Sequence, residues 1–185
     1  KNSGKYQDHF HIPLQSGSDR ILSSMRRKYD TFQYRGVIAL VKEYFPDASI
    51  GADIIAGYPG ETDEEFQETI DFVTELPITH FHVFPYSKRK NTTAARSENH
   101  IQGDLKKKRV RALIDLGEKK LADFRRLQLN SSSEVLFERE KQGYFVGLTS
   151  NYLRVRVKSN EDLTNQIRKV KINNEDNNIL NGIIS

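Results

Sequence analysis

The chain has 185 residues, a mass of 21.4 kDa and a formal net charge of +4, so it is long enough for one full hydrophobic core and a second small one. With 36% hydrophobic and 29% charged residues, and no apolar run near the roughly 20 residues that a membrane span needs, the composition indicates a soluble globular protein with no membrane role. The sequence holds no cysteine, which excludes disulfides and thiolate metal ligands from this chain.

The charge is unevenly distributed. Residues 1–102 carry 12 Lys and Arg against 14 Asp and Glu, whereas residues 103–185 carry 17 against 11. A clustered positive field attracts polyanions, of which nucleic-acid backbones are the commonest. A solvated surface has the same pattern, so charge alone leaves both interpretations open.

The first part of the chain alternates strand patterns with helix patterns. Strands are predicted at 9–15, 48–57 and 80–86, and helices at 19–27, 31–45 and 62–76. In the helix over 31–45, Val37, Leu40, Val41 and Tyr44 share one face, which predicts its buried side. This alternation predicts parallel βαβ units, whose sheet must be covered on both faces or closed into a barrel.

The helix over 62–76 has a clear start and a clear core face. Thr62 and Glu65 form a capping-box pattern, and Phe66, Ile70 and Val73 form the apolar stripe. Three strand-helix units are too few for a closed parallel barrel. We therefore expect the missing strands to come from sequence upstream of this chain.

The second part begins with a long helix from Asp104 to about Leu129, followed by short strands. The apolar stripe of that helix is surrounded by lysines and arginines, including Arg109 and Arg125. Strand patterns follow at 134–140, 144–150, 152–158, 166–172 and 178–184. Such closely spaced strands without helices predict a small β-barrel or sandwich, and hence domains at 1–128 and 129–185.

Three predicted strands end in loops of small and polar residues, where parallel α/β folds place their ligands. These loops hold Gln15 and Ser16, Gly57 to Glu61, and Tyr86. Asp53 adds a carboxylate inside an otherwise apolar strand, which needs a partner or a function. A tight turn explains any one loop alone, but three convergent loops favour a binding site.

Two His-x-His pairs lie on predicted strands. His9 with His11, and His80 with His82, have the spacing that binds zinc in barrel hydrolases. Packed and hydrogen-bonded core histidines are the commoner use of such pairs, so we predict no metal site in this chain.

The strand over 152–158 alternates strictly between apolar and polar residues. Leu153, Val155 and Val157 face a predicted core, and the opposite face carries Tyr152, Arg154, Arg156 and Lys158. An aromatic ring beside cations suits single-stranded or looped RNA, which needs stacking and phosphate contacts. A solvated barrel face is the alternative, and the basic helix and the basic segment 168–171 favour RNA.

Four segments together identify a family resemblance. "HIPLQSGSDRILSSMRRKYDTFQY", "DIIAGYPGETDEEFQETIDFV", "HVFPYSKRKNTTAA" and "GLTSNYLRVRVK" resemble the C-terminal portion of the tRNA methylthiotransferases of the radical S-adenosylmethionine superfamily. The phrasing of "FHIPLQSGSD" and "HVFPYSKR" is most similar to the branch that acts on threonylcarbamoyladenosine. The resemblance implies an α/β fold, the C-terminal part of a partial TIM-like (β/α) barrel, followed by a small all-β TRAM barrel.

The resemblance also implies site residues. Those expected to bind S-adenosylmethionine are Gln15, Ser16, Asp53, Gly57, Gly60, Val83 and Tyr86. The family pattern places a glutamate where Gly60 stands, and Glu61 follows one residue later. Those expected to contact tRNA, at its anticodon stem-loop, are Arg26, Arg27, Lys88 and Arg89, together with the barrel residues Tyr152, Arg154, Arg156 and Lys158.

One departure from the family is large. Its members hold two [4Fe-4S] clusters through cysteines, and this chain has none. We therefore expect no catalytic residue here, the cluster cysteines upstream of Lys1, and a chain that is inactive by itself. The predicted parent is a cytoplasmic transferase that inserts a methylthio group at C2 of the modified adenosine. The alternatives are a stand-alone RNA-binding module, and a methylthiotransferase for another tRNA adenosine or a ribosomal protein.

Overall fold

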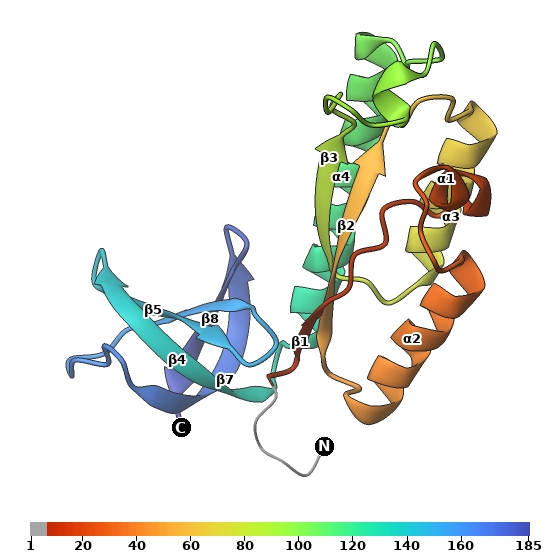
Figure 1. Cartoon of the computed structure of the whole chain (residues 1–185). Coiled ribbons are helices and arrows are strands. Elements are labelled where there is room, and N and C mark those ends of the chain that lie inside the picture. The colour runs from red at the N-terminus through yellow and green to blue at the C-terminus, as the bar shows by residue number, and fades with distance from the viewer. Residues whose placement is uncertain (1–6) are drawn as a thin grey trace. The chain divides into compact units, whose positions relative to one another are not determined.

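The computed structural model describes residues 7–185 (Figure 1), and the first six residues of the predicted N-terminal domain lie outside that range. Internal contacts divide the described chain into two units. The α/β unit comprises Phe10–Pro46 and Ile50–Lys120, and the β-barrel unit comprises Asp47–Ser49 and Leu121–Ser185 with the described residues up to His9. The division falls inside the long helix α4 (Gly103–Leu127), ahead of the predicted boundary near residue 129. Within the described range, no helix is long and apolar enough to cross a membrane.

A three-stranded sheet organises the α/β unit, in the order β1 (His9–His11), β2 (Ser49–Ala56) and β3 (His80–Pro85). Strands β2 and β3 are parallel, with Asp53 opposite His82. Beyond β1 the chain stays beside β2, because the amide of Gln15 donates to the carbonyl of Asp53 at 2.8 Å. The predicted parallel strands are therefore confirmed, with a first strand shorter than the predicted range 9–15.

The helices of the unit are α1 (Asp19–Ser24), α2 (Thr31–Tyr44), α3 (Asp63–Glu75) and the first part of α4. Side chains of α2, α3 and α4 pack on one face of the sheet. Its core includes Leu14, Ile38, Ile54, Val73 and Leu113, all at most 1% exposed. The other face of the sheet, with Asp53, Ile55 and Phe84, lines a cavity.

The predicted buried face of α2 is wrong for three of its four residues, since only Val41 packs against the core. Val37, Leu40 and Tyr44 are 47%, 54% and 49% exposed, whereas Tyr34 and Ile38 are buried. The helix carries two overlapping apolar stripes, and its rotation about its axis decides between them. The hydroxyl of Tyr34 donates to the carbonyl of Ile12 at 2.7 Å, which fixes that rotation with an interaction that no periodicity reveals.

The β-barrel closes through strands β4 (Ser132–Lys141), β5 (Tyr144–Thr149), β6 (Arg154–Val157), β7 (Ile167–Asp176) and β8 (Ile179–Ile184). The strand order around it is β4-β5-β6-β8-β7. Leu153, Val155 and Val157 are at most 3% exposed, so the predicted alternation of residues 152–158 is confirmed. Closure removes the exposed strand edges that a short sheet would otherwise present.

Two arginines of the basic helix are buried, contrary to the solvated surroundings that the sequence pattern suggests. In the α/β unit, Arg109 is 3% exposed and donates to Glu61 and Asp63. In the barrel unit, Arg125 is 6% exposed, and its Nε lies 2.5 Å from a carboxylate oxygen of Glu175. Neither positive charge is therefore available to a polyanion, because each is taken up by a carboxylate.

Candidate functional site

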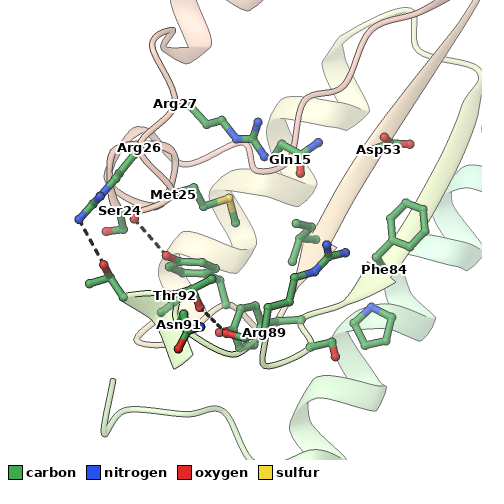
Figure 2. Close-up of a pocket in the computed structure, with 17 residues that line it drawn as sticks. Gln15, Ser24, Met25, Arg26, Arg27, Asp53, Phe84, Arg89, Asn91 and Thr92 are labelled. Carbon is green, nitrogen blue, oxygen red and sulfur yellow. Dashed lines mark hydrogen bonds between the residues drawn. The ribbon is translucent and has the colours of Figure 1, made fainter. Parts of the chain in front are cut away.

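A cavity of about 850 Å³ opens at the carboxyl ends of the strands in the α/β unit (Figure 2). Its walls bring together six residues that the sequence analysis assigned to two different ligands. Gln15, Asp53 and Tyr86 come from the predicted cofactor set, and Arg26, Arg27 and Arg89 come from the predicted RNA set. A volume of this size suits a small molecule such as a nucleoside, since ligand pockets span about 300 to 1,000 Å³.

Gln15 occupies a strained position at the rim of the sheet. Its φ is 72°, a left-handed conformation that is uncommon for a residue other than glycine. Two backbone bonds to β2 hold it there, from its amide to Asp53 at 2.8 Å and from the amide of Ile55 to its carbonyl at 2.9 Å. Such strain persists where surrounding structure enforces it, and it is common at binding sites.

The two cations after α1 reach the cavity because the helix ends early. The predicted helix over 19–27 stops at Ser24, and Arg26 has a φ of 59°. This turn directs the chain so that both Arg26 and Arg27 line the cavity. Arg26 also donates to the hydroxyl of Thr93 at 3.2 Å, which links this wall to the loop after β3.

Aromatic rings form another part of the wall. Tyr58 and Tyr86 meet edge to face with ring centroids 5.4 Å apart, and the Tyr58 hydroxyl donates to the carbonyl of Ser24 at 3.0 Å. Burial raises the pKa of Tyr58 above its ordinary value, so it stays a neutral donor. The hydroxyl of Tyr86 is buried and has no hydrogen-bond partner among the described residues. Tyr86 thus lines the cavity with its side chain and carries a buried hydroxyl whose hydrogen-bonding capacity is unused among the described residues.

Three further lining residues are Tyr58, Phe84 and Met25. Tyr58 lies within the predicted loop Gly57 to Glu61 and Phe84 lies between the predicted Val83 and Tyr86, although neither was assigned individually, and Met25 was missed. The available signal was position, because Tyr58 and Phe84 flank the strand ends from which the predicted site was built. For Met25 no such signal existed, since it reaches the cavity only because α1 ends one residue before it.

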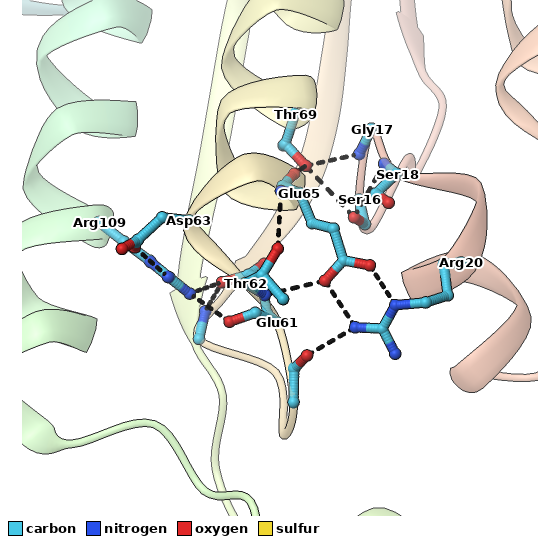
Figure 3. A network of polar contacts seen from close by, with 12 residues as sticks. Ser16, Gly17, Ser18, Arg20, Glu61, Thr62, Asp63, Glu65, Thr69 and Arg109 are labelled. Atoms are coloured by element: carbon cyan, nitrogen blue, oxygen red, sulfur yellow. Dashed lines mark hydrogen bonds and ion pairs between the residues drawn. The ribbon is translucent and has the colours of Figure 1, made fainter.

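The other predicted cofactor residues lie outside the cavity lining. Ser16 is fully buried, and its hydroxyl contacts Thr69 and accepts from the amide of Ser18 (Figure 3). Val83 packs against the hydrophobic core of the helix-covered face. Gly57 and Gly60 form the loop after β2, and the predicted RNA residue Lys88 is exposed. Their assigned roles stay predictions.

The loop from Gly57 to Asp63 is held by a buried ion-pair network (Figure 3). The carboxylate of Glu61 accepts from the amide of Gly57 at 2.9 Å and from Arg109 at 2.7 Å, and Arg109 also donates to Asp63 at 2.6 Å. Burial raises the pKa of Glu61, while the two donors oppose that shift. Gly57 needs its φ of 75° to make this turn. Glu61 thus shapes the loop through contacts within the protein.

A second ion pair fixes the start of α3. Glu65 completes the capping box with Thr62 and is also paired with Arg20, whose guanidinium donates to the carbonyl of Gly60 at 2.6 Å. The hydrogen bond from Arg20 lowers the pKa of the Glu65 carboxyl below its ordinary value. The predicted capping box is confirmed. The contacts of Arg20 with Glu65 and Gly60 join α1, the loop after β2 and α3.

On the barrel, two cations of the predicted RNA face lie beside an aromatic ring, Tyr144, that the sequence analysis did not assign. The guanidinium of Arg156 and the ammonium of Lys158 lie 5.0 and 5.2 Å from the ring centroid of Tyr144. Arg156 is also paired with Asp176 at 2.6 Å. Tyr152 is exposed, with a φ of 67°, and lies before β6 rather than in it. Tyr144 was missed because only the hairpin register of β5 with β6 brings it near Lys158.

Comparison with known proteins gives a consistent set of relatives. The Radical SAM superfamily matches residues 1–73. The chain is 40% identical over 175 residues to threonylcarbamoyladenosine tRNA methylthiotransferase MtaB of Bacillus subtilis, covering 92% of this chain and 39% of that protein. It is 34% identical over 186 residues to tRNA-2-methylthio-N(6)-dimethylallyladenosine synthase of Pelotomaculum thermopropionicum, covering 99% and 42%.

The fold has a relative among solved structures. Coproporphyrinogen III oxidase (HemN) of Escherichia coli, a radical SAM enzyme, matches 91% of this chain and 41% of its own with a TM-score of 0.53 and 16% identity. The chain thus spans about two fifths of the length of the proteins it matches.

Proposed function

We propose that the chain is the cofactor- and RNA-binding part of a radical SAM tRNA methylthiotransferase, because the Radical SAM superfamily matches residues 1–73 and two tRNA-methylthiolating enzymes are 40% and 34% identical to it. The proposed reaction inserts a methylthio group at C2 of threonylcarbamoyladenosine in tRNA. The relative named for that nucleoside is 40% identical and the dimethylallyladenosine synthase 34% identical, which favours the first substrate. The identification of the β-barrel as a TRAM domain belongs to the same proposal.

The cavity of the α/β unit carries this proposal, because its residues fit S-adenosylmethionine. Phe84, Tyr58 and Tyr86 offer apolar ring surface for an adenine, and the buried Tyr86 hydroxyl offers an unused polar group. Gln15 offers amide donors and acceptors to a ribose or carboxylate. Arg27 and Arg89 add positive charge that suits the cofactor carboxylate or a tRNA phosphate.

The residues present do not fit an iron-sulfur cluster. Clusters of this kind are held by cysteine thiolates, and the 185 residues include no cysteine. In the proposed enzyme, residues other than these 185 would therefore hold the cluster. No step of the reaction is assigned to a cluster in this chain.

In the proposed reaction, the chain's own residues would bind the cofactor and orient it toward the tRNA base. S-adenosylmethionine, when bound, supplies both the radical precursor and the methyl group in the proposed chemistry. Gln15, Tyr58 and Tyr86 would hold it against the ends of β2 and β3, so that its reactive end is fixed relative to the tRNA base. Arg26, Arg27 and Arg89 would hold the nucleic acid near the same cavity.

Substitutions at the cavity test the proposal in the whole protein encoded by the gene. Nucleosides from digested tRNA would be analysed by mass spectrometry in cells that carry only the variant gene. We expect Gln15→Ala and Tyr86→Phe to reduce the methylthio nucleoside by about five-fold or more, since a lost hydrogen bond in a buried site costs about 1 to 3 kcal/mol. Arg35→Ala is the matched control, because Arg35 is half exposed on α2 and pairs with Glu75. Unchanged methylthiolation in both cavity variants would contradict the proposal.

Cofactor binding separates the proposal from a stand-alone RNA-binding module. Calorimetry of the 185-residue chain with S-adenosylmethionine should show saturable binding that Tyr86→Phe weakens. The RNA-binding module predicts salt-sensitive tRNA binding with no affinity for the cofactor. That second result would reject the cavity as a cofactor site and leave the exposed cations of β6 as the functional surface.

A further inference from the structure

Three side chains from three neighbouring strands converge on the open face of the sheet. Asp53 of the central strand β2 lies between His11 of β1 and His82 of β3. Its Oδ1 is 3.1 Å from Nε2 of His11 and 3.4 Å from Nδ1 of His82. The two imidazole rings face each other with centroids 5.1 Å apart. One carboxylate oxygen is therefore flanked by two imidazole nitrogens.

The parallel register explains this convergence. Asp53 and His82 are paired across β2 and β3, and side chains at paired positions of a sheet point to the same face. The amide of Ile12 donates to the carbonyl of Gly51, which sets His11 at the neighbouring level on the other side of β2. The apolar neighbours Ala52 and Ile54 point to the opposite face and are fully buried.

The two distances from the Asp53 oxygen to the histidine nitrogens are those of neighbouring metal ligands. Around an ion with bonds of about 2.0 to 2.2 Å, adjacent ligand atoms in tetrahedral or octahedral positions lie about 2.8 to 3.6 Å apart. The two distances to Asp53 fall in this range, and all three atoms lie within 4.8 Å of one another. The His82 side chain is 55% exposed, so its ring has room to adjust to an ion.

Two imidazoles and one carboxylate define the class of ion. Imidazole nitrogen suits zinc, iron, cobalt and nickel, whereas magnesium and calcium prefer sites made of oxygen alone. Three protein ligands also leave coordination positions open to solvent or to a ligand. Asp53 lines the cavity as well, so these open positions would be next to the space that the cavity encloses.

We propose that His11, Asp53 and His82 form a binding site for one divalent transition-metal ion. The site differs from the zinc site that the two His-x-His pairs suggest, because it takes one histidine from each pair. His80 lies outside the group of ligand atoms that are within 4.8 Å of one another, and its Nδ1 contacts the hydroxyl of Thr79 at 2.9 Å. The competing explanation is a cluster in which both imidazoles donate hydrogen bonds to Asp53 and no ion binds.

Zinc binding to the 185-residue chain tests the proposal. Zn²⁺ would be titrated against a chromophoric chelator, and Co²⁺ would serve as a probe with visible absorption bands. We expect one Zn²⁺ per chain, displaced little by excess Mg²⁺, and weaker binding on acidification because protons compete for imidazole nitrogen. His11→Gln and His82→Gln should each weaken binding by at least about ten-fold, as a lost metal contact does.

The control is His80→Gln, a histidine on the same strand as His82 and outside the cluster. It should change zinc affinity less than about two-fold, and circular dichroism would verify the fold of each variant. The absence of saturable binding, competition by Mg²⁺ at similar concentrations, or an equal loss in the His80 variant would each overturn the site. The proposal does not depend on the proposed function, whose test variants, Gln15→Ala and Tyr86→Phe, include no ligand of this ion.

Discussion

The α/β unit and the β-barrel present their exposed cations on surfaces of different shape. In the α/β unit, Arg26, Arg27 and Arg89 project from loops around a concave cavity of about 850 Å³. In the barrel, Arg154 and Lys158 project from or beside strand β6, with Tyr144 next to Lys158. A cavity selects a small molecule by enclosing it, whereas a strand face suits an extended polyanion. The comparison shows that local geometry decides which ligand a basic residue can serve.

The same units also bury arginines, and these have a structural purpose. Arg109 and Arg125 lie on one helix with several exposed lysines, yet each is buried against carboxylates. Net charge counts all of them equally. Substitutions can therefore distinguish the exposed cations, which are proposed to bind a ligand, from the buried arginines, which pair with carboxylates.

The largest effect is expected from Arg109→Ala. The change would leave Glu61 buried without its cation, and breaking a buried pair in this way costs about 3 to 5 kcal/mol. The measurement is urea unfolding followed by circular dichroism. Arg111→Ala is the control, since Arg111 is exposed on the same helix and pairs with Asp115, and should cost under about 1 kcal/mol. Equal costs for both variants would mean that Arg109 does not hold the loop.

Glycine substitutions give the next largest contrast within the α/β unit. A Cβ on Gly17 would lie 2.7 Å from the Cα of Thr69 and 2.9 Å from the Cβ of Phe72, so Gly17→Ala should destabilise by about 1 to 3 kcal/mol. A Cβ on Gly36 of α2 would meet no atom within 4 Å. Gly36→Ala should instead stabilise by up to about 1 kcal/mol. Differential scanning calorimetry would measure both, and a stable Gly17 variant would contradict the tight packing of α3 on the loop after β1.

The barrel surface is tested by tRNA binding at several salt concentrations. Arg154→Ala and Lys158→Ala should each lower the affinity and reduce the salt slope by about 1, as the loss of one phosphate contact does. Arg156→Ala should have a smaller effect, because Arg156 is already paired with Asp176 and Asn181. A filter-binding or polarisation assay would give these slopes. Unchanged slopes for Arg154 and Lys158 would remove this face from RNA recognition.

The smallest effect concerns the dependence of stability on pH. Hydrogen bonding from Arg20 lowers the pKa of Glu65 below 4.5. Its contribution is therefore present above that value and is lost as the pH falls through the lowered pKa. Because the Arg20 side chain is 54% exposed, we expect less than about 1 kcal/mol.

Glu65→Gln keeps the capping-box residue type and should show a flatter loss of stability in acid. Glu64→Gln, on the exposed side of the same helix turn, is the matched control. Identical acid profiles for the Glu65 variant and the unchanged protein would show that the Arg20 pair makes no measurable contribution.

Much of the fold could be predicted from local patterns. The five barrel strands, the caps of α3 and the alternation around Val155 follow from periodicity and capping residues that lie within a few positions of each other. Gln15 and Tyr86 could be predicted as neighbours in the cavity because strand ends can be located in the sequence, and Asp53 because it is a carboxylate inside an apolar strand. Such patterns do not show which side of a helix or strand packs against the rest of the fold.

By itself, the sequence determined the order and type of the elements and the family that the chain resembles. The tertiary structure alone decided which stripe of α2 is buried, that Arg109 is paired with Glu61, and that His11 and His82 meet at Asp53. The physical reason is the range of the interactions. Periodicity and capping act between residues a few positions apart, whereas ion pairs and strand register join residues about thirty to fifty positions apart and have no local signature.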